Sequence, residues 1–132
     1  MAIVRELYER FPDIAAGEPP TAVLELFHAE VRLDQSRNTF NPAVFEGIDG
    51  MLSALKVVRE TWESFVLVPE RFVAIGDQVV VFNSVKARGA SGGVEVENRS
   101  SSVHTLRDGK IVALTIYPDP DEGLRVAEAS AK

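Results

Sequence analysis

Apolar residues recur at helical spacing through the first half of the chain. Residues 2–11 carry one apolar stripe, which Pro12 ends. A second stripe occupies residues 21–27, and a third, longer one starts beside Asp49. The members of the third stripe are Ile48, Met51, Leu52, Leu55, Val58, Trp62 and Phe65. The spacing therefore predicts three amphipathic helices, the last reaching Phe65 and the second ending near His28.

The second half of the chain has the residue pattern of β-strands. VRLD at 31–34 predicts a short strand, and a polar loop, QSRNTFNP, follows it. Four β-branched runs then occupy residues 65–75, 78–87, 94–106 and 110–117, separated by GD, RGASGG and RDG, which are typical of hairpin turns. Pro69 indicates an irregularity or an edge position in the first long strand. The pattern predicts an antiparallel meander, followed by a short terminal helix or a frayed tail from residue 119.

Helices first and a meander afterwards indicate an α+β fold with the helices on one face of a curled sheet. A length of 132 residues suits one domain, and the chain contains no internal repeat or linker, so residues 1–132 are expected to form a single domain. Long strands with apolar residues on both faces need cover on both sides. The helices are expected to cover only one, which favours a partner on the other.

Charge and composition exclude several classes of binding partner and cofactor. The net charge is −6, which argues against nucleic acid and anionic membrane. The longest apolar run, residues 79–82, is too short to cross a bilayer, and the charged N-terminal segment is unlike a signal peptide, so a cytoplasmic protein is expected. The chain lacks cysteine, its two histidines are far apart, and no glycine-rich loop joins a strand to a helix. We therefore expect no metal and no cofactor.

Asp34 is the first candidate for chemistry, because it ends the short predicted strand. A carboxylate there is a general base if it faces an apolar pocket, since burial would raise its pKa towards neutrality. The alternative is a solvated residue that caps the following loop and is held ionised by Arg32 and Arg37. The sequence leaves both interpretations open.

His104 is the second candidate. Strand alternation places it on the same face as Ser100 and Ser102, where it is either an acid–base group in a pocket or a satisfied core histidine. Trp62 either packs in the core or forms part of a pocket wall. Tyr117, at the end of the last predicted strand, either contacts a ligand or packs under the C-terminal segment.

Several stretches together resemble one known family. They are LYERF and AAGE near the N-terminus, LFHAEVRLD, FEGIDGMLSAL, and SSVHTLRDGKIVALTIYPD near the end. In this order they resemble the SnoaL-like polyketide cyclase and ketosteroid isomerase group of the nuclear transport factor 2-like superfold. The resemblance implies a cone-shaped, cystatin-like fold in which a strongly curled antiparallel sheet packs against N-terminal helices. It also implies an apolar pocket and a homodimer formed through the sheet.

The resemblance puts Asp34 at the position of the isomerase base. The isomerases also use an oxyanion hole made of a tyrosine and an aspartic acid, which stabilises the dienolate. Its apolar surroundings keep this aspartic acid neutral. Here the aspartic acid falls near Ser102 and the tyrosine near Arg10, with Tyr8 as an imperfect stand-in. The acid–base aspartate of the cyclases aligns with Ile116. The epoxide hydrolase set of the same superfold, an Asp-Arg-Asp arrangement, is also missing.

Two functions follow from these expectations. The first is a cofactor-independent isomerase, cyclase or dehydratase that moves protons on a small apolar molecule, with Asp34 and His104 as the catalytic pair. The second is a non-catalytic module of the same fold for small-ligand binding or dimerisation. The expected ligand pocket consists of Tyr8, Trp62, Phe82, Ser102, Ile116 and Tyr117.

Overall fold

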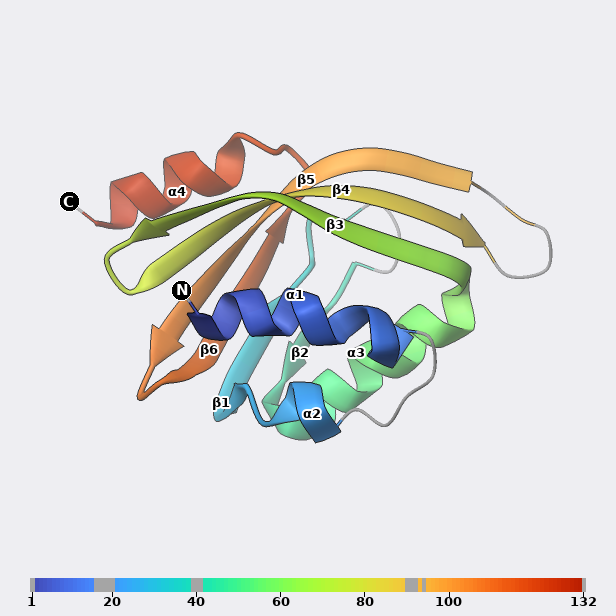
Figure 1. Ribbon diagram of the computed structural model, residues 1–132, viewed down its shortest axis with the longest axis horizontal. Coiled ribbons are helices and arrows are strands. Elements are labelled where there is room, and N and C mark those ends of the chain that lie inside the picture. The colour runs from blue at the N-terminus through green and yellow to red at the C-terminus, as the bar shows by residue number, and fades with distance from the viewer. Residues whose placement is uncertain (1, 16–20, 39–41, 90–92, 94, 132) are drawn as a thin grey trace.

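A single six-stranded sheet organises the protein (Figure 1). The computed structural model describes residues 2–15, 21–38, 42–89, 93 and 95–131. The elements are α1 (Ala2–Ala15), α2 (Thr21–Leu24), β1 (Phe27–Asp34), β2 (Val44–Glu46), α3 (Gly47–Thr61), β3 (Trp62–Ile75), β4 (Gln78–Gly89), β5 (Glu95–Arg107), β6 (Lys110–Tyr117) and α4 (Glu122–Ser130). The strand order is β2-β1-β6-β5-β4-β3, and only the pairing of β1 with β6 is parallel. The expected α+β class is confirmed.

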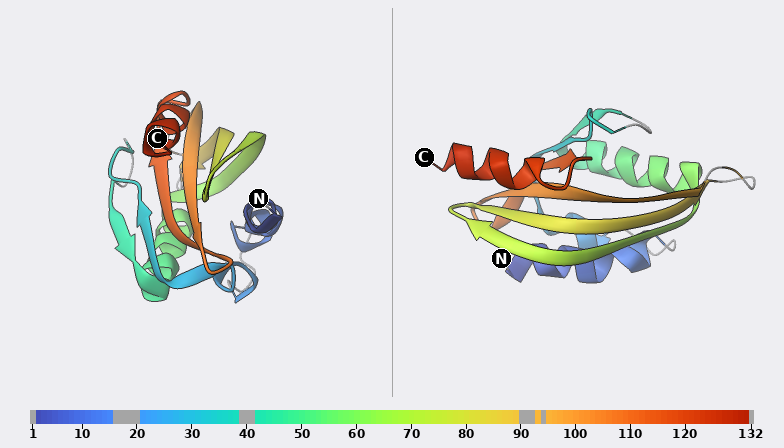
Figure 2. Two further views of the ribbon diagram at one scale, coloured as in Figure 1. Left: turned by 90° about the vertical axis from the view of Figure 1, so that its left-hand side faces the viewer. Right: turned by 90° about the horizontal axis from the view of Figure 1, so that it is seen from above.

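Strand alternation divides the sheet into two faces with different cover. The long strands bend around α1 and α3, which lie on the face that we call inner, and α4 lies on the outer face (Figure 2). The inner face contributes to the larger apolar core, for example through Val31, Val79 and Leu114. A smaller cluster on the outer face joins Val80, Val103, Tyr117 and Ala127 of α4, with Phe82 at its margin.

The position of α4 corrects the expectation that all helices lie on one face. Gly123 brings the start of α4 close to the sheet, because its N–H donates to Ser101 Oγ at 3.1 Å. A methyl group built at Gly123 would lie 2.4 Å from that oxygen, so only glycine permits this approach. Residues 119–131 thus supply part of the outer cover from within the chain. Dimerisation through the sheet stays a prediction.

The boundary between α3 and β3 also differs from the sequence expectation. The helix ends at Thr61 and the strand begins at Trp62, so Trp62 and Phe65 belong to β3. Their spacing fits the end of a helical stripe, but from Ser64 to Glu70 the burial alternates residue by residue. Phe65 and Leu67 turn inward, while Val66 and Val68 are each 49% exposed. Pairing with β4 prevails over the local helical pattern.

Other boundaries shift in the same way. The second helix is only Thr21–Leu24, and β1 begins at Phe27, so His28 belongs to a strand. The strand β2 was not expected from the loop sequence. The RDG turn is confirmed, with positive φ at Asp108 and Gly109, and so is the irregularity at Pro69, which adjoins a register shift in an edge strand. Residues 16–20 of the loop AAGEPP and residues 90–92 of the RGASGG turn lie outside the described residues.

None of the described helices is both long enough and apolar enough to cross a membrane.

Candidate functional site

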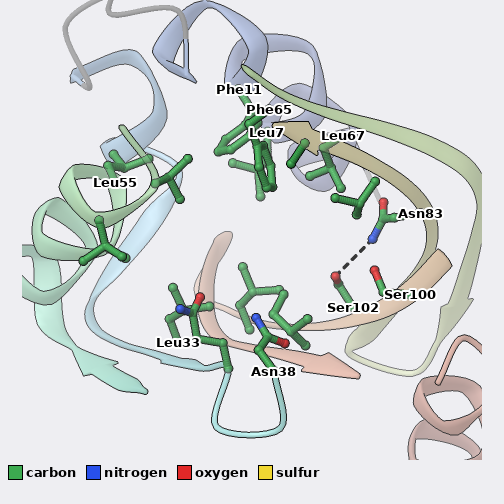
Figure 3. A pocket seen from close by; sticks show the side chains of 18 of the residues that line it. Leu7, Phe11, Leu33, Asn38, Leu55, Phe65, Leu67, Asn83, Ser100 and Ser102 are labelled. Atoms are coloured by element: carbon green, nitrogen blue, oxygen red, sulfur yellow. Dashed lines mark hydrogen bonds between the residues drawn. The ribbon is translucent and has the colours of Figure 1, made fainter. Parts of the chain in front are cut away.

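A pocket of about 340 Å³ lies between the inner face of the sheet and the helices α1 and α3. Its wall is mainly apolar, and it includes side chains from α1, α3 and β3, which surround an open centre in Figure 3. Representative apolar members are Leu7, Phe11, Leu55, Phe65 and Leu67. A volume of this size is within the range of small-molecule sites.

The polar part of the wall lies mainly on β4 and β5. Asn83, Ser100 and Ser102 point into the same side of the pocket in Figure 3, since the two strands pair with Asn83 opposite Ser100. Alternation along β5 puts His104 on this face too, as the sequence predicted. Gln35 and Asn38, on the loop after β1, also line the pocket. The pocket therefore has a polar patch on β4 and β5, and further polar side chains on the loop after β1, in an otherwise mainly apolar surface.

Tyr8 and His104 form a buried hydrogen-bonded pair behind this patch. His104 is fully buried, and its Nδ1 lies 3.2 Å from the carbonyl oxygen of Val79. A carbonyl only accepts, so Nδ1 carries the hydrogen and Nε2 keeps a lone pair. The Tyr8 hydroxyl, 3.4 Å from Nε2, therefore donates to His104. The pair holds the imidazole in one neutral tautomer.

Burial sets the protonation states of both groups. It lowers the pKa of His104 to about 4, although hydrogen bonds with the backbone at Val79 and Ser102 oppose the change. Burial likewise raises the pKa of Tyr8 to about 12, against hydrogen bonds from Ser102 and Asn83. At neutral pH the imidazole is therefore uncharged and the phenol keeps its proton.

Asn83 connects the pair to the pocket. Its side chain is 1% exposed, and its Nδ2 donates to Ser102 Oγ at 3.1 Å (Figure 3). Nδ2 also lies 3.5 Å from the Tyr8 hydroxyl and 3.4 Å from the carbonyl oxygen of Val81. The amide oxygen, Oδ1, is buried and accepts no hydrogen bond from any described residue. Such an unsatisfied acceptor is unusual in a folded protein.

Asp34 projects away from this pocket. The ladder places Asp34 beside Thr115 and Val103, whereas Leu33 is beside Leu114 and His104. Cross-strand neighbours share a face, so Asp34 and His104 lie on opposite faces of the sheet. Leu33 lines the pocket and Asp34 does not.

The surroundings of Asp34 are those of a loop cap. Its Oδ1 accepts hydrogen bonds from the backbone N–H of Ser36 at 3.0 Å and from Ser36 Oγ at 2.6 Å. These bonds hold the pKa of Asp34 below its usual value, with smaller contributions from Arg37 and Arg32. Arg37 pairs with Asp34 at 3.5 Å and stacks on the ring of Tyr117, 4.9 Å from its centroid. The carboxylate is thus ionised in a polar cluster on the outer side.

Comparison with known families identifies the chain. The model of the SnoaL-like domain matches residues 4–114, most of the sequence. The chain belongs to the SnoaL-like domain family. No curated protein matches it significantly in sequence.

Solved structures share the fold of this SnoaL-like domain. TerC, co-crystallised with polyporic acid, is 21% identical with a TM-score of 0.75, and 96% of each chain is covered. A nuclear transport factor 2-like protein of unknown function from Burkholderia pseudomallei is also 21% identical with a TM-score of 0.75, covering 96% of this chain and 95% of the other.

A further neighbour is similar in fold alone. It is a hypothetical protein with a ketosteroid isomerase-like fold from Catenulispora acidiphila, in complex with trimethylamine. It is 16% identical with a TM-score of 0.71, and the match covers 87% of this chain and 83% of the other. The TM-scores establish the shared fold, and the function has to be argued from the pocket.

The SnoaL-like domain brings together four of the six residues expected in the pocket, namely Tyr8, Trp62, Ser102 and Ile116. The other two, Phe82 and Tyr117, lie in the outer cluster. Their strand positions have the opposite parity to the pocket-lining residues of β4 and β6. The pairing of Asp34 with His104 is the expectation that this geometry does not bring together.

Asn83 was not predicted from the sequence as a site residue, although its position in the sequence carries a signal. It is a lone amide in the strand VVVFNSV, at an odd position that shares a face with Val79 and Val81. A polar residue on the apolar face of a buried strand needs a partner, and that requirement singles it out.

The residue types in the pocket wall limit the acid–base and metal chemistry that the site can perform. Tyr8 is the only titratable residue among the described residues that line the pocket, and no Asp, Glu, His, Lys or Arg is among them. No group of metal-ligating side chains was found in the described part of the chain. The site can enclose an apolar body and form hydrogen bonds with one polar group on it.

Proposed function

We propose that this SnoaL-like protein binds one small, largely apolar, uncharged molecule in the pocket on the inner face of the sheet. The observation that carries the proposal is the 340 Å³ pocket, with its mainly apolar wall and its polar patch on β4 and β5. Burying such a molecule removes its apolar surface from water, which is the main source of affinity in sites of this kind. Neighbours crystallised with polyporic acid or trimethylamine support small-molecule binding by the fold.

Binding is favoured over proton abstraction by the energetics of the buried pair. His104 has a pKa of about 4, so protonating it at pH 7 costs about 4 kcal/mol. Ionising Tyr8, with a pKa of about 12, costs about 7 kcal/mol at the same pH. In the free protein His104 is therefore a weak base and Tyr8 a weak acid, whereas the Tyr8 hydroxyl lines the pocket and can still take part in a hydrogen bond to a neutral ligand.

The test uses the single tryptophan of the chain, Trp62, which lines the pocket. N-phenyl-1-naphthylamine, a neutral apolar probe, should bind with micromolar affinity and take up excitation energy from Trp62. Ala87→Phe fills the pocket from β4 and should weaken binding at least tenfold. The matched control, Lys86→Phe, adds the same side chain on the opposite face of the strand and should leave binding unchanged. The proposal fails if the probe does not bind, or if both variants bind it equally well.

The second candidate function is catalysis of an isomerisation, cyclisation or dehydration by proton transfer. The observation in its favour is the Tyr8–His104 hydrogen bond directly behind the polar patch. If the Tyr8 hydroxyl turns its hydrogen from His104 Nε2 to a bound carbonyl oxygen, it can stabilise the negative charge that develops there. In this version Tyr8 contacts the substrate, and His104, packed against its ring, positions it. The proton that leaves the substrate passes to water, because no described lining residue is a base.

Deuterium exchange distinguishes the two functions. The α-hydrogens of 2-tetralone, a small apolar ketone, exchange with D₂O only through its enol. Acceleration of this exchange by the protein, abolished in Tyr8→Phe and retained in Asp34→Asn, would establish proton-transfer catalysis at the pocket. Loss of the acceleration in Asp34→Asn would instead restore Asp34 as the base. Binding of the ketone without acceleration supports the binding function.

A further inference from the structure

The amide of Asn83 has one orientation that its neighbours permit. The Tyr8 hydroxyl donates its hydrogen to His104 Nε2, so its oxygen faces Asn83 as an acceptor. The carbonyl oxygen of Val81, 3.4 Å away, can only accept as well. Both contacts require N–H groups on this side of the amide. Nδ2 therefore faces Tyr8 and Val81, and the carbonyl oxygen Oδ1 is the atom without a partner.

The amide is not tightly held in this position. Nδ2 has two hydrogens for three acceptors, and only the contact with Ser102 Oγ, at 3.1 Å, is shorter than 3.4 Å. Oδ1 is sealed from solvent in this orientation. The torsion about the Cβ–Cγ bond of asparagine is broad, and rotation about this bond on ligand binding is the step that would bring Oδ1 to the pocket that Asn83 lines.

The remainder of the wall excludes a charged partner for this oxygen. No described lining residue carries a charge at neutral pH, so an ammonium or carboxylate group would be buried without a counter-ion. A neutral donor has no such penalty. Ser100, the cross-strand neighbour of Asn83, is also 8% exposed and lines the same side, so a hydroxyl placed there meets a second hydroxyl.

We propose that Asn83 selects ligands that carry a neutral hydroxyl group, an alcohol, phenol or enol, and that Oδ1 accepts its hydrogen. This inference rests on the proposed binding function and specifies the class of molecule that the pocket takes. Asn83 is then a specificity-determining residue: the apolar pocket supplies affinity for the body of the ligand, and the unsatisfied carbonyl supplies discrimination, because a ligand without a donor leaves it unpaired.

Four naphthalenes of similar size test this selectivity by displacement of N-phenyl-1-naphthylamine at pH 7. They are 2-naphthol, which has a neutral donor; 2-methoxynaphthalene, which only accepts; naphthalene, which does neither; and 2-naphthoate, which is charged. We expect 2-naphthol to bind at least tenfold more tightly than the methoxy compound and naphthalene, a difference of about 1.4 kcal/mol. The naphthoate should bind more weakly than naphthalene.

Variants identify the group responsible. Asn83→Leu should reduce the preference for 2-naphthol to less than threefold while retaining naphthalene binding, and Asn83→Ala provides the same test if the leucine variant does not fold. Ser84→Ala is the matched control, because Ser84 lies next to Asn83 on the opposite face of β4, outside the pocket lining, and its substitution should keep the preference. Equal binding of naphthol and its methyl ether, or a preference that survives at Asn83→Leu, overturns the inference. Failure of every compound, naphthalene included, overturns the proposed function instead.

Discussion

Lowering the pH should destabilise the protein specifically through His104. The folded protein holds this imidazole neutral with a pKa of about 4, while a histidine in the unfolded chain has an ordinary pKa of 6.5. Between these values the unfolded chain binds a proton that the folded protein does not. The contribution to stability is therefore complete above about pH 6.5 and is lost progressively as the pH falls towards 4.

The size of the effect follows from the shift. Each pH unit below 6.5 lowers the free energy of unfolding by about 1.36 kcal/mol until the folded-state pKa is reached. At pH 5 the loss relative to pH 8 amounts to about 2 kcal/mol. Small domains are stable by only about 5–15 kcal/mol, so a loss of this size is readily measured.

Urea unfolding at pH 5, 6, 7 and 8 measures this contribution. His104→Gln removes the titrating ring, so the stability difference between the parent and this variant should be about 2 kcal/mol smaller at pH 5 than at pH 8. Carboxylates that titrate in both proteins cancel in the difference. His28→Gln removes the other histidine, whose side chain is 20% exposed in β1, and measures its contribution separately from that of His104.

Nuclear magnetic resonance gives an independent reading of the same group. The ring of His104 should stay neutral down to about pH 5 and carry its hydrogen on Nδ1, as its contact with the Val79 carbonyl requires. A stability difference that does not change with pH would refute the reasoning. So would a His104 ring that titrates at its ordinary pKa in the folded protein.

Two further substitutions test the outer face of the sheet. Gly123→Ala should lower the free energy of unfolding by about 1–3 kcal/mol in urea melts, because the new methyl group would lie 2.4 Å from Ser101 Oγ. Ser101→Gly in the same chain should recover part of the loss, whereas Glu128→Ala, at an exposed site of α4, should cost less than about 0.5 kcal/mol. Asp34→Asn should cost about 0.5–1 kcal/mol, since the new side chain still accepts from Ser36, and should leave probe binding unchanged. Weaker probe binding by a folded Asp34→Asn protein would contradict the assignment of Asp34 to the outer face.

The limits of prediction from sequence are clear at Trp62 and Phe65. Both fit the helical stripe that starts at Ile48, and both also fit a strand whose alternate residues face inward. Local periodicity cannot separate these interpretations over so few residues. Pairing of β3 with β4, a contact between segments that meet only in the folded chain, decides in favour of the strand.

For Asp34, the alternation of residues in the sequence disagrees with the role that the family resemblance implies. In VRLD the apolar residues Val31 and Leu33 alternate with Arg32 and Asp34, so the acid was already on the opposite side of the strand from the apolar residues. An apolar pocket is lined by the apolar side. The alternation therefore predicts that Asp34 points away from the pocket, although the resemblance puts it at the position of the isomerase base.

Patterns along the chain determined the α+β class, the hairpin turns and the face shared by His104, Ser100 and Ser102, because helical and strand periodicities are local properties of the backbone. Tertiary structure decided which face encloses the pocket and that α4 covers the other. It also decided that Asn83 keeps an unpaired carbonyl beside the Tyr8–His104 pair. These features depend on contacts between residues up to 96 positions apart, and such contacts exist only once the register of every strand is set.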